Sequence, residues 1–259
     1  MKLLVLCPIP VEYAACRETL ALRDLPSLAG CRLCRGTIGN CEIHAVESGP
    51  GKARAASAAA SGIQRFSPDL VLDTGSCAGV EPGSVVGEIV IARECYETDI
   101  SGSCFPRRSI PEMRLASALS FLPAEVSERL QQEAVELGET NGLRVRLGIQ
   151  ACGEYLIHTA QMRSELYRLF QAAAGNWETA GVFVAALKSA LPPLSLRVVT
   201  DLGDQDALRD FRRNVKPRSR VLYGYLAALV EYGWFDRLLE QWGCLERIVL
   251  DGIPAAVLP

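Results

Sequence analysis

The stretch Asp69-Leu-Val-Leu-Asp-Thr-Gly-Ser-Cys-Ala-Gly79 decides the fold that this sequence predicts. Pro68 introduces a short apolar, partly β-branched run, which gives way to small residues from Thr74 onward, as in a buried strand that ends in a loop. Crevices form at the carboxyl ends of strands in an α/β sheet, and small side chains let a ligand approach the backbone. The loop is therefore either a floor for a sugar or phosphate, or a tight turn that needs glycine.

Length and composition narrow the class of protein. A chain of 259 residues that is 49% hydrophobic and 22% charged is typical of a globular protein, and it fits one large α/β domain better than two ordinary ones. The formal net charge of −3 gives no reason to expect a nucleic-acid or membrane-surface partner. No apolar run is long enough to span a membrane, and the opening segment 1–7 has no basic region or cleavage site. We therefore interpret that segment as a strand and expect a cytoplasmic protein.

The ten cysteines are scattered over the length and are best interpreted as free thiols. One cluster, Cys31-Arg-Leu-Cys34 followed by Cys41-Glu-Ile-His44, has a spacing that resembles a zinc site. Yet 32–35 and 42–46 have the pattern of two strands around the turn 36–40, and residues three apart on a strand point to opposite faces. The sequence therefore does not favour a metal site.

Strands and helices alternate along the chain, which predicts a mainly parallel sheet whose strand ends gather at one edge. Residues 102–142 are less regular and predict a variable insertion, either on the surface or as a lid over the site. No repeat or linker marks a second domain, so we expect one domain over 1–259. The expected strands are 2–7, 43–47, 70–72, 85–92, 143–151 and 194–199, and the expected helices are 11–22, 53–66, 124–137, 159–173, 180–191 and 217–239.

Polar side chains suited to chemistry fall at the ends of these elements: Glu12, Ser76, Glu178 and Asp201. Three carboxylates that converge on a loop of small residues form a site for sugar hydroxyls and proton transfer. Each acid also has a simpler interpretation. Glu12 is a favourable charge at a helix N-terminus, Glu178 is a helix cap, and Asp201 belongs to a turn.

Four segments in this order resemble the nucleoside phosphorylase and nucleosidase superfamily of the purine and uridine phosphorylase type. They are Ser48-Gly-Pro-Gly-Lys52, Asp73–Gly79 followed by Val86-Gly-Glu-Ile-Val90, Trp177-Glu-Thr-Ala180, and Val198-Val-Thr-Asp-Leu-Gly-Asp204. Within that superfamily the chain is most similar to the methylthioadenosine/S-adenosylhomocysteine nucleosidases, from the start of the chain to about residue 211. The resemblance implies a single α/β domain with a central twisted mixed β-sheet flanked by helices in three α/β/α layers.

The resemblance also gives each acid a role. Glu12 would activate the attacking water, with Ser76 beside it, and Glu178 would hold the 2′- and 3′-hydroxyls of the ribose. Asp201 would protonate the purine N7, so we expect its pKa to be raised by burial or hydrogen bonding. These roles suit the chemistry, because breaking an N-glycosidic bond builds positive charge on the ribose and negative charge on the base. The catalytic residues implied are Glu12 and Asp201, and the substrate-binding residues are Ser76, Gly79, Leu156, Ile157, Trp177, Glu178 and Thr200.

Several positions depart from the family pattern. Asn176 stands where an acid is frequent, and Trp177 replaces a methionine near the ribose. Leu156 stands where an aromatic side chain often stacks on the base, and Gly203 replaces an alanine. These changes predict a reshaped pocket for the sugar and the base.

The function predicted is hydrolysis of a purine nucleoside such as 5′-methylthioadenosine or S-adenosylhomocysteine to the free base and a ribose derivative. Glu12 favours hydrolysis, because phosphorolysis needs no water-activating base and requires arginines around phosphate. The alternatives are a futalosine hydrolase or adenosyl-lipid nucleosidase, a phosphate-dependent purine nucleoside phosphorylase, and a non-catalytic nucleoside-binding module. The resemblance implies no metal or organic cofactor, and it implies a homo-oligomer, either a dimer or a larger ring.

Overall fold

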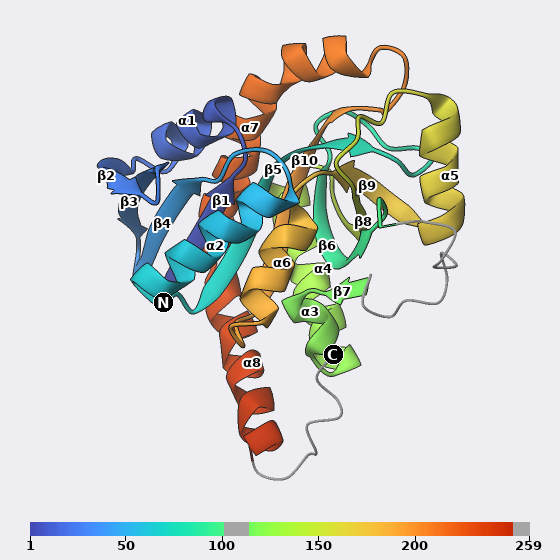
Figure 1. The fold of residues 1–259 in the computed structure, drawn as a ribbon. Coiled ribbons are helices and arrows are strands. Elements are labelled where there is room, and N and C mark those ends of the chain that lie inside the picture. Colours follow the sequence, from blue (N-terminus) through green and yellow to red (C-terminus); the bar gives the residue numbers. More distant parts are fainter. Residues whose placement is uncertain (101–113, 251–259) are drawn as a thin grey trace.

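The computed structural model describes residues 1–100 and 114–250, with side chains up to residue 244. Its core is a ten-stranded sheet in the order β10-β6-β8-β9-β5-β1-β4-β3-β2, with β7 paired to β6 (Figure 1). The strands are β1 Lys2–Cys7, β2 Arg23–Leu28, β3 Cys31–Ile38, β4 Cys41–Glu47, β5 Leu70–Gly79, β6 Ile89–Glu97, β7 Arg114–Ala116, β8 Val145–Cys152, β9 Ala172–Asn176 and β10 Pro193–Asp201. The helices are α1 Pro10–Thr19, α2 Lys52–Phe66, α3 Ala118–Phe121, α4 Ala124–Thr140, α5 Ala160–Phe170, α6 Thr179–Leu187, α7 Ala207–Glu231 and α8 Trp234–Leu250.

The sheet is mixed, as the resemblance implied. Strand β1 runs parallel to β4 and β5, and β5 runs parallel to β10, whereas β6 lies antiparallel to β10 and β9 antiparallel to β5. Because β10 pairs with both β6 and β5, the pairings β10–β6–β8–β9–β5 return to β10 and close this half of the sheet. The carboxyl ends of β5 and β10 therefore lie next to β9, where the polar residues gather.

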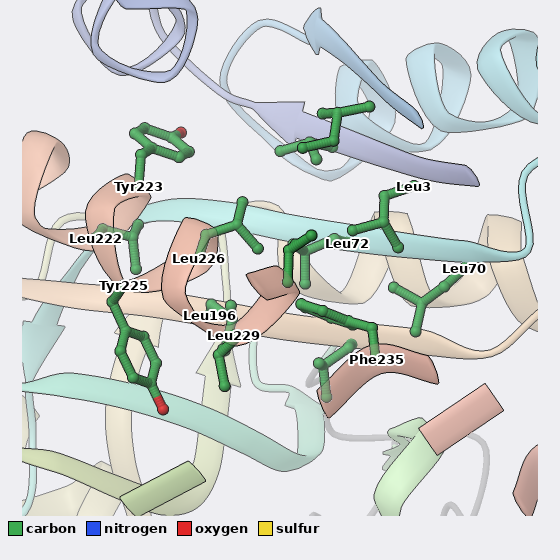
Figure 2. Close-up of a cluster of buried hydrophobic side chains, with 14 of the residues drawn as sticks. Leu3, Leu70, Leu72, Leu196, Leu222, Tyr223, Tyr225, Leu226, Leu229 and Phe235 are labelled. Atoms are coloured by element: carbon green, nitrogen blue, oxygen red, sulfur yellow. The ribbon is translucent and has the colours of Figure 1, made fainter. Parts of the chain in front are cut away.

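Helices cover the sheet on both faces. Helices α2 and α6 pack against each other on one face, where they bury Leu4, Leu6 and Val71 (Figure 1). The alternate residues of the same strands, such as Leu3 and Leu72, point to the other face, as the pleat of a strand requires. Helices α7 and α8 cover that face; Figure 2 shows Leu222, Tyr223, Tyr225, Leu226, Leu229 and Phe235 of these helices near Leu3, Leu70, Leu72 and Leu196 of the strands. The three-layer arrangement is thus confirmed.

The central strand differs from its prediction. It does not end in a loop at Thr74 but continues to Gly79, because residues 73–78 pair with β10. Gly75 has a φ of +131°, and a Cβ there would lie 3.0 Å from both carboxylate oxygens of Glu12. Glycine is therefore required at this position by the close approach of an acid, rather than by a turn.

The bounds of other helices and strands also differ from the prediction. The strand expected from residue 85 begins only at Ile89, because 85–88 form a turn with Gly87 at a φ of +95°. The helix expected over 159–173 ends at Phe170, and the following strand β9 was not predicted. The long helix expected over 217–239 is two helices: α7 begins at residue 207, contains Pro217, and ends before Gly233, whose φ is +70°.

The described part of the expected insertion packs into the body of the protein. The hydroxyl of Tyr225 donates to the carbonyl of Ala134 at 2.7 Å, and the indole of Trp234 donates to the carbonyl of Leu130 at 2.8 Å, both in α4. Residues 102–113 of the insertion lie outside the described residues. Among the helices that the structure describes, none has the length and apolar character that a membrane span needs.

The expected hairpin of the cysteine cluster forms from β3 and β4, but both strands are longer than predicted, because residues 36–38 pair with β4 and leave only 39–40 for the turn. His44 stacks on Phe66 with ring centroids 4.0 Å apart, and its Nε2 lies 3.2 Å from Glu42. Over residues 1–100 and 114–244, no group of three His, Cys, Asp or Glu side chains is placed to hold a metal ion.

Candidate active site

Glu12 lies in the first turn of α1, just beyond the end of β1, and its side chain is 1% exposed. Its Oε1 accepts hydrogen bonds from the backbone N–H of Ser76 at 2.7 Å and from the Ser76 hydroxyl at 2.6 Å. Its Oε2 accepts the N–H of Ile9 at 3.3 Å, so the acid also caps its own helix. Burial raises the pKa of Glu12 to about 7, although the bonds from Ser76 and the charge of Arg197 act to lower it.

Arg197 and Asp73 form a buried ion pair that the sequence analysis did not include in the site. Arg197 lies on β10 and Asp73 on β5, and they are 1% and 0% exposed. Nε and Nη2 of the guanidinium donate to the two carboxylate oxygens at 2.9 and 2.5 Å. Two signals in the sequence point to this pair: an arginine inside the apolar run 194–199, and an aspartate inside a buried strand, each of which requires a partner.

Arg197 connects this pair to the predicted site. Its Nη1 donates to the carbonyl of Ser76 at 3.1 Å and lies 3.1 Å from Oε2 of Glu178. Burial raises the pKa of Glu178, and the charge of Arg197 opposes that shift. One buried cation is therefore shared by Asp73 and Glu178 and lies close enough to Glu12 to favour the ionised form of that acid as well.

Glu178 does not cap its own helix. It stands at the N-cap position of α6 without a side-chain bond to that helix, and its Oε1 instead accepts the N–H of Gly51 at 3.0 Å. The next amide, that of Lys52, donates to Oε1 of Glu154 at 2.6 Å. The glycine loop before α2 was predicted to suit an anion or a sugar edge; two of its amide groups already bind carboxylates of this chain.

Asp201 ends β10 and is 7% exposed. Its Oδ1 accepts the N–H of Gly203 at 3.1 Å and its Oδ2 accepts the hydroxyl of Thr200 at 3.1 Å, so the turn interpretation of this acid is also correct. Burial raises the pKa of Asp201 to about 6, against the effect of both hydrogen bonds. The shift has the direction that a proton donor requires.

One cavity brings most of the predicted residues together. It is lined by Glu12, Ser76, Leu156, Ile157, Trp177, Glu178, Thr200 and Asp201, together with Arg197 and Asn176. Residues that the sequence analysis missed form the rest of the wall: Pro8, Ile9, Pro50, Cys77, Ala78, Gly175, Ala207, Leu208 and Phe211. No residue of 114–142 lines this cavity, so that described part of the insertion is not a lid over it.

Gly79 is the predicted substrate-binding residue that lies outside this lining. A Cβ at Gly79 would lie 2.8 Å from the Cβ of Ser84 and 3.1 Å from Val199, so glycine is needed there for packing. By contrast, Leu156 and Trp177 are 44% and 38% exposed beside the cavity. The indole N–H of Trp177 donates to the carbonyl of Tyr155 at 2.8 Å, which ties the two segments of the wall together.

Comparison with known families agrees with this architecture. The family model described as the phosphorylase superfamily matches residues 2–231. This chain belongs to the phosphorylase superfamily. The match continues past residue 211, where the resemblance in the sequence analysis stopped, and includes the whole of α7.

Individual relatives are similar to this chain over most of their own length. The 5′-methylthioadenosine/S-adenosylhomocysteine nucleosidase of Glaesserella parasuis is 25% identical over 214 residues, which cover 82% of this chain and 90% of that protein. The nucleosidase of the same name from Anoxybacillus flavithermus is 26% identical over 220 residues, with 82% and 90% covered.

Solved structures of the superfamily share the fold. The Helicobacter pylori 5′-methylthioadenosine/S-adenosylhomocysteine nucleosidase with butyl-thio-DADMe-Immucillin-A has a TM-score of 0.79 at 21% identity, covering 90% of this chain and 98% of that one. The futalosine hydrolase of the same organism has a TM-score of 0.78 at 22% identity, with 90% and 98% covered. The predicted fold class is therefore confirmed.

Proposed function

We propose that this member of the phosphorylase superfamily is a nucleosidase. It hydrolyses the N-glycosidic bond of a purine nucleoside such as 5′-methylthioadenosine or S-adenosylhomocysteine, and it releases the free base and a ribose derivative. The observation that carries the proposal is the presence in one cavity of two buried carboxyl groups, Glu12 and Asp201, whose pKa values are raised to about 7 and about 6. Two acids that titrate near neutrality are suited to general base and general acid roles in one reaction.

In the proposed reaction, Glu12 is the general base. Its Oε1 is held by two donors of Ser76, so the carboxylate has a fixed direction when it accepts a proton from water. The water attacks the anomeric carbon as the bond to the base breaks. Asp201 donates its proton to the leaving purine, which therefore departs as a neutral species.

The sugar is held by Glu178, whose carboxylate accepts hydrogen bonds from the 2′- and 3′-hydroxyls. Arg197 and the N–H of Gly51 orient this carboxylate and favour its ionised form, against the effect of burial on its pKa. The carboxylates of Glu12, Asp73 and Glu178 outnumber the single positive charge of Arg197. This excess of negative charge stabilises the positive charge that develops on the ribose ring.

Two contacts favour water over phosphate as the nucleophile. The amide groups of Gly51 and Lys52 at the start of α2 would suit a phosphate, but they donate to Glu178 and Glu154. The guanidinium of Arg197 is engaged by Asp73 and Glu178. An incoming phosphate would have to displace carboxylates from both groups, and it would be repelled by those that remain.

We propose further that the protein is cytoplasmic and forms a homo-oligomer. All cysteines of the described residues are free thiols, which suits a reducing compartment. Large apolar side chains of Leu156, Trp177 and Leu208 are exposed beside the cavity, which suits contact with a second copy. Size-exclusion chromatography with light scattering measures the oligomeric state directly, and a mass equal to one chain would contradict this proposal.

The proposed activity is tested by chromatography of base release from 5′-methylthioadenosine, S-adenosylhomocysteine, adenosine, inosine and futalosine, with and without phosphate. We expect release of the base without phosphate, and loss of that release in Glu12→Gln with nucleoside binding retained. Release only with phosphate would identify a phosphorylase. Binding without release under either condition would indicate a nucleoside-binding module.

A further inference from the structure

Asn176 is a buried polar residue of the cavity lining to which the proposed reaction gives no role. It ends β9, is 6% exposed, and immediately precedes Trp177 and Glu178. Its side-chain Oδ1 accepts two backbone hydrogen bonds, from the N–H of Glu178 at 3.0 Å and the N–H of Thr179 at 3.0 Å. The side chain therefore fixes the backbone from which Glu178 projects.

Asn176 is itself held from the opposite side. Its Nδ2 donates to Oε1 of Gln150 at 2.7 Å, and Gln150 lies on β8 with 0% exposure. The same oxygen lies 2.8 Å from the hydroxyl of Thr179, which also lies 2.6 Å from Asp73. The chain Gln150–Asn176–Glu178 is thus joined, through Thr179, to the ion pair that holds Arg197.

The amide of Asn176 both accepts and donates hydrogen bonds, so it makes all of these contacts without carrying a charge. A carboxylate could accept the two backbone N–H groups, but it has no proton for Oε1 of Gln150. It would also be a further anion beside Asp73 and Glu178, which share one arginine. An apolar side chain would leave the buried N–H groups of Glu178 and Thr179 without the acceptor that they share.

We propose that Asn176, anchored by Gln150, is a positioning residue for Glu178: it orients the sugar-binding carboxylate and does so without adding charge to the site. This inference rests on the proposed function, because it concerns recognition of the 2′-hydroxyl. It assigns Asn176 and Gln150 to discrimination between ribonucleosides and 2′-deoxyribonucleosides. Neither residue has a direct part in proton transfer.

The test compares kcat and KM for adenosine and 2′-deoxyadenosine in wild type, Asn176→Ala and Asn176→Asp. For Asn176→Ala we expect KM for adenosine to rise about 10-fold, equivalent to one neutral hydrogen bond, with a smaller change for 2′-deoxyadenosine. For Asn176→Asp, which keeps the acceptor but loses the bond to Gln150, we expect KM for adenosine about 3-fold above the wild-type value at high pH. It should rise as the pH falls, beginning at a higher pH than in wild type, because the added anion raises the pKa of Glu178.

Gln150→Met is the second variant, which removes the anchor and leaves Asn176 in place. We expect it to lower the preference for adenosine in the same direction but by less, roughly 3-fold. The double variant should be no worse than Asn176→Ala alone, since the two residues act through one chain of bonds. Thermal unfolding of every variant identifies any that fail to fold, and the remaining variants then carry the comparison.

Each outcome is decisive. Equal losses for both sugars in the folded variants would overturn the positioning role and leave the proposed hydrolysis intact. If wild type releases no base from any nucleoside of the panel, the hydrolysis proposal fails, and dissociation constants for adenosine and 2′-deoxyadenosine replace KM. A preference for adenosine in wild-type binding that is lost in Asn176→Ala would then still support the positioning role. Absence of binding to every nucleoside tested would overturn both proposals.

Discussion

The Ser76→Ala variant should lower kcat/KM on the acid side of the pH profile and leave the alkaline side nearly unchanged. Glu12 must be ionised to accept a proton, and its pKa is raised to about 7; Asp201 must be protonated, and its pKa is raised to about 6. At pH 6.5 about a quarter of each group is in the required form, so about 6% of the enzyme is active. That fraction falls about 20-fold two pH units to either side, which predicts a bell-shaped profile of kcat/KM.

The Ser76 hydroxyl donates to the Glu12 carboxylate at 2.6 Å and stabilises its ionised form. A hydrogen bond to a charged group contributes about 1.5–3 kcal/mol, or roughly 1–2 pKa units. Without it, we expect the pKa of Glu12 to rise to about 8–9, so kcat/KM on the acid side of the profile falls about 10–100-fold and the apparent alkaline pKa of the bell moves upward. The active fraction at the best pH then falls about 7-fold or more.

The assay is kcat/KM for base release between pH 4.5 and pH 9 with the best substrate of the panel. Ser189→Ala is the matched control, because its hydroxyl is exposed beyond α6 and bonds only to the carbonyl of Ala185 at 2.9 Å. At the alkaline end of this range kcat/KM should stay within about 2-fold of wild type in both variants, since Asp201 is not a partner of Ser76. Unchanged kcat/KM between pH 4.5 and pH 5.5 in Ser76→Ala would refute the assignment of Glu12 as the base.

Three further outcomes follow from the same contacts. Asp201→Asn removes the proton donor, so base release should fall by about 10²–10⁴-fold at pH 6.5 while nucleoside binding by calorimetry persists; unchanged turnover would exclude the acid role. Glu12→Gln should raise the free energy of unfolding at pH 8. The folded protein favours the protonated form of Glu12, because burial raises its pKa. This contribution to the wild-type free energy of unfolding is fully present below the unfolded pKa near 4.5 and is lost as the pH rises through about 7. The difference is about 3 kcal/mol, which urea titration at pH 4 and pH 8 would detect. Arg197→Met leaves the buried Asp73 carboxylate without its counter-ion and should lower the free energy of unfolding by about 3–5 kcal/mol, and Asp73→Asn in the same chain should recover part of it; an unchanged urea midpoint would show that the pair is not needed.

The buried part of the site holds more carboxylates than cations. Arg197 contacts both Asp73 and Glu178, and it is buried with them. Because water does not screen these charges, removal or addition of a single charge there should affect several pKa values together. The neutral Asn176 is consistent with this balance, since it forms its bonds to the same region without a charge.

The sequence alone determined the elements that depend on local pattern. The apolar runs at 2–7, 70–72 and 194–199 became β1, the first part of β5 and most of β10, because buried strands need continuous apolar residues. Glu12 was correctly placed beyond the first strand, since Pro8 and Pro10 end a strand and start a helix. Motif order was sufficient to identify the superfamily.

Only the tertiary structure decided which groups meet. Strand β5 runs through to Gly79 because β10 pairs with it, and no property of the small residues themselves reveals that partner. Arg197 and Asp73 are 124 residues apart in the sequence, and Glu178 accepts the N–H of Gly51, which lies 127 residues before it. Local propensity reports on neighbours in the chain, whereas the charge state of a buried acid depends on burial and on partners that the closed sheet brings together. The sequence therefore named Glu12, Glu178 and Asp201, and the fold determined their pKa shifts and placed Arg197 near Glu12 and Glu178.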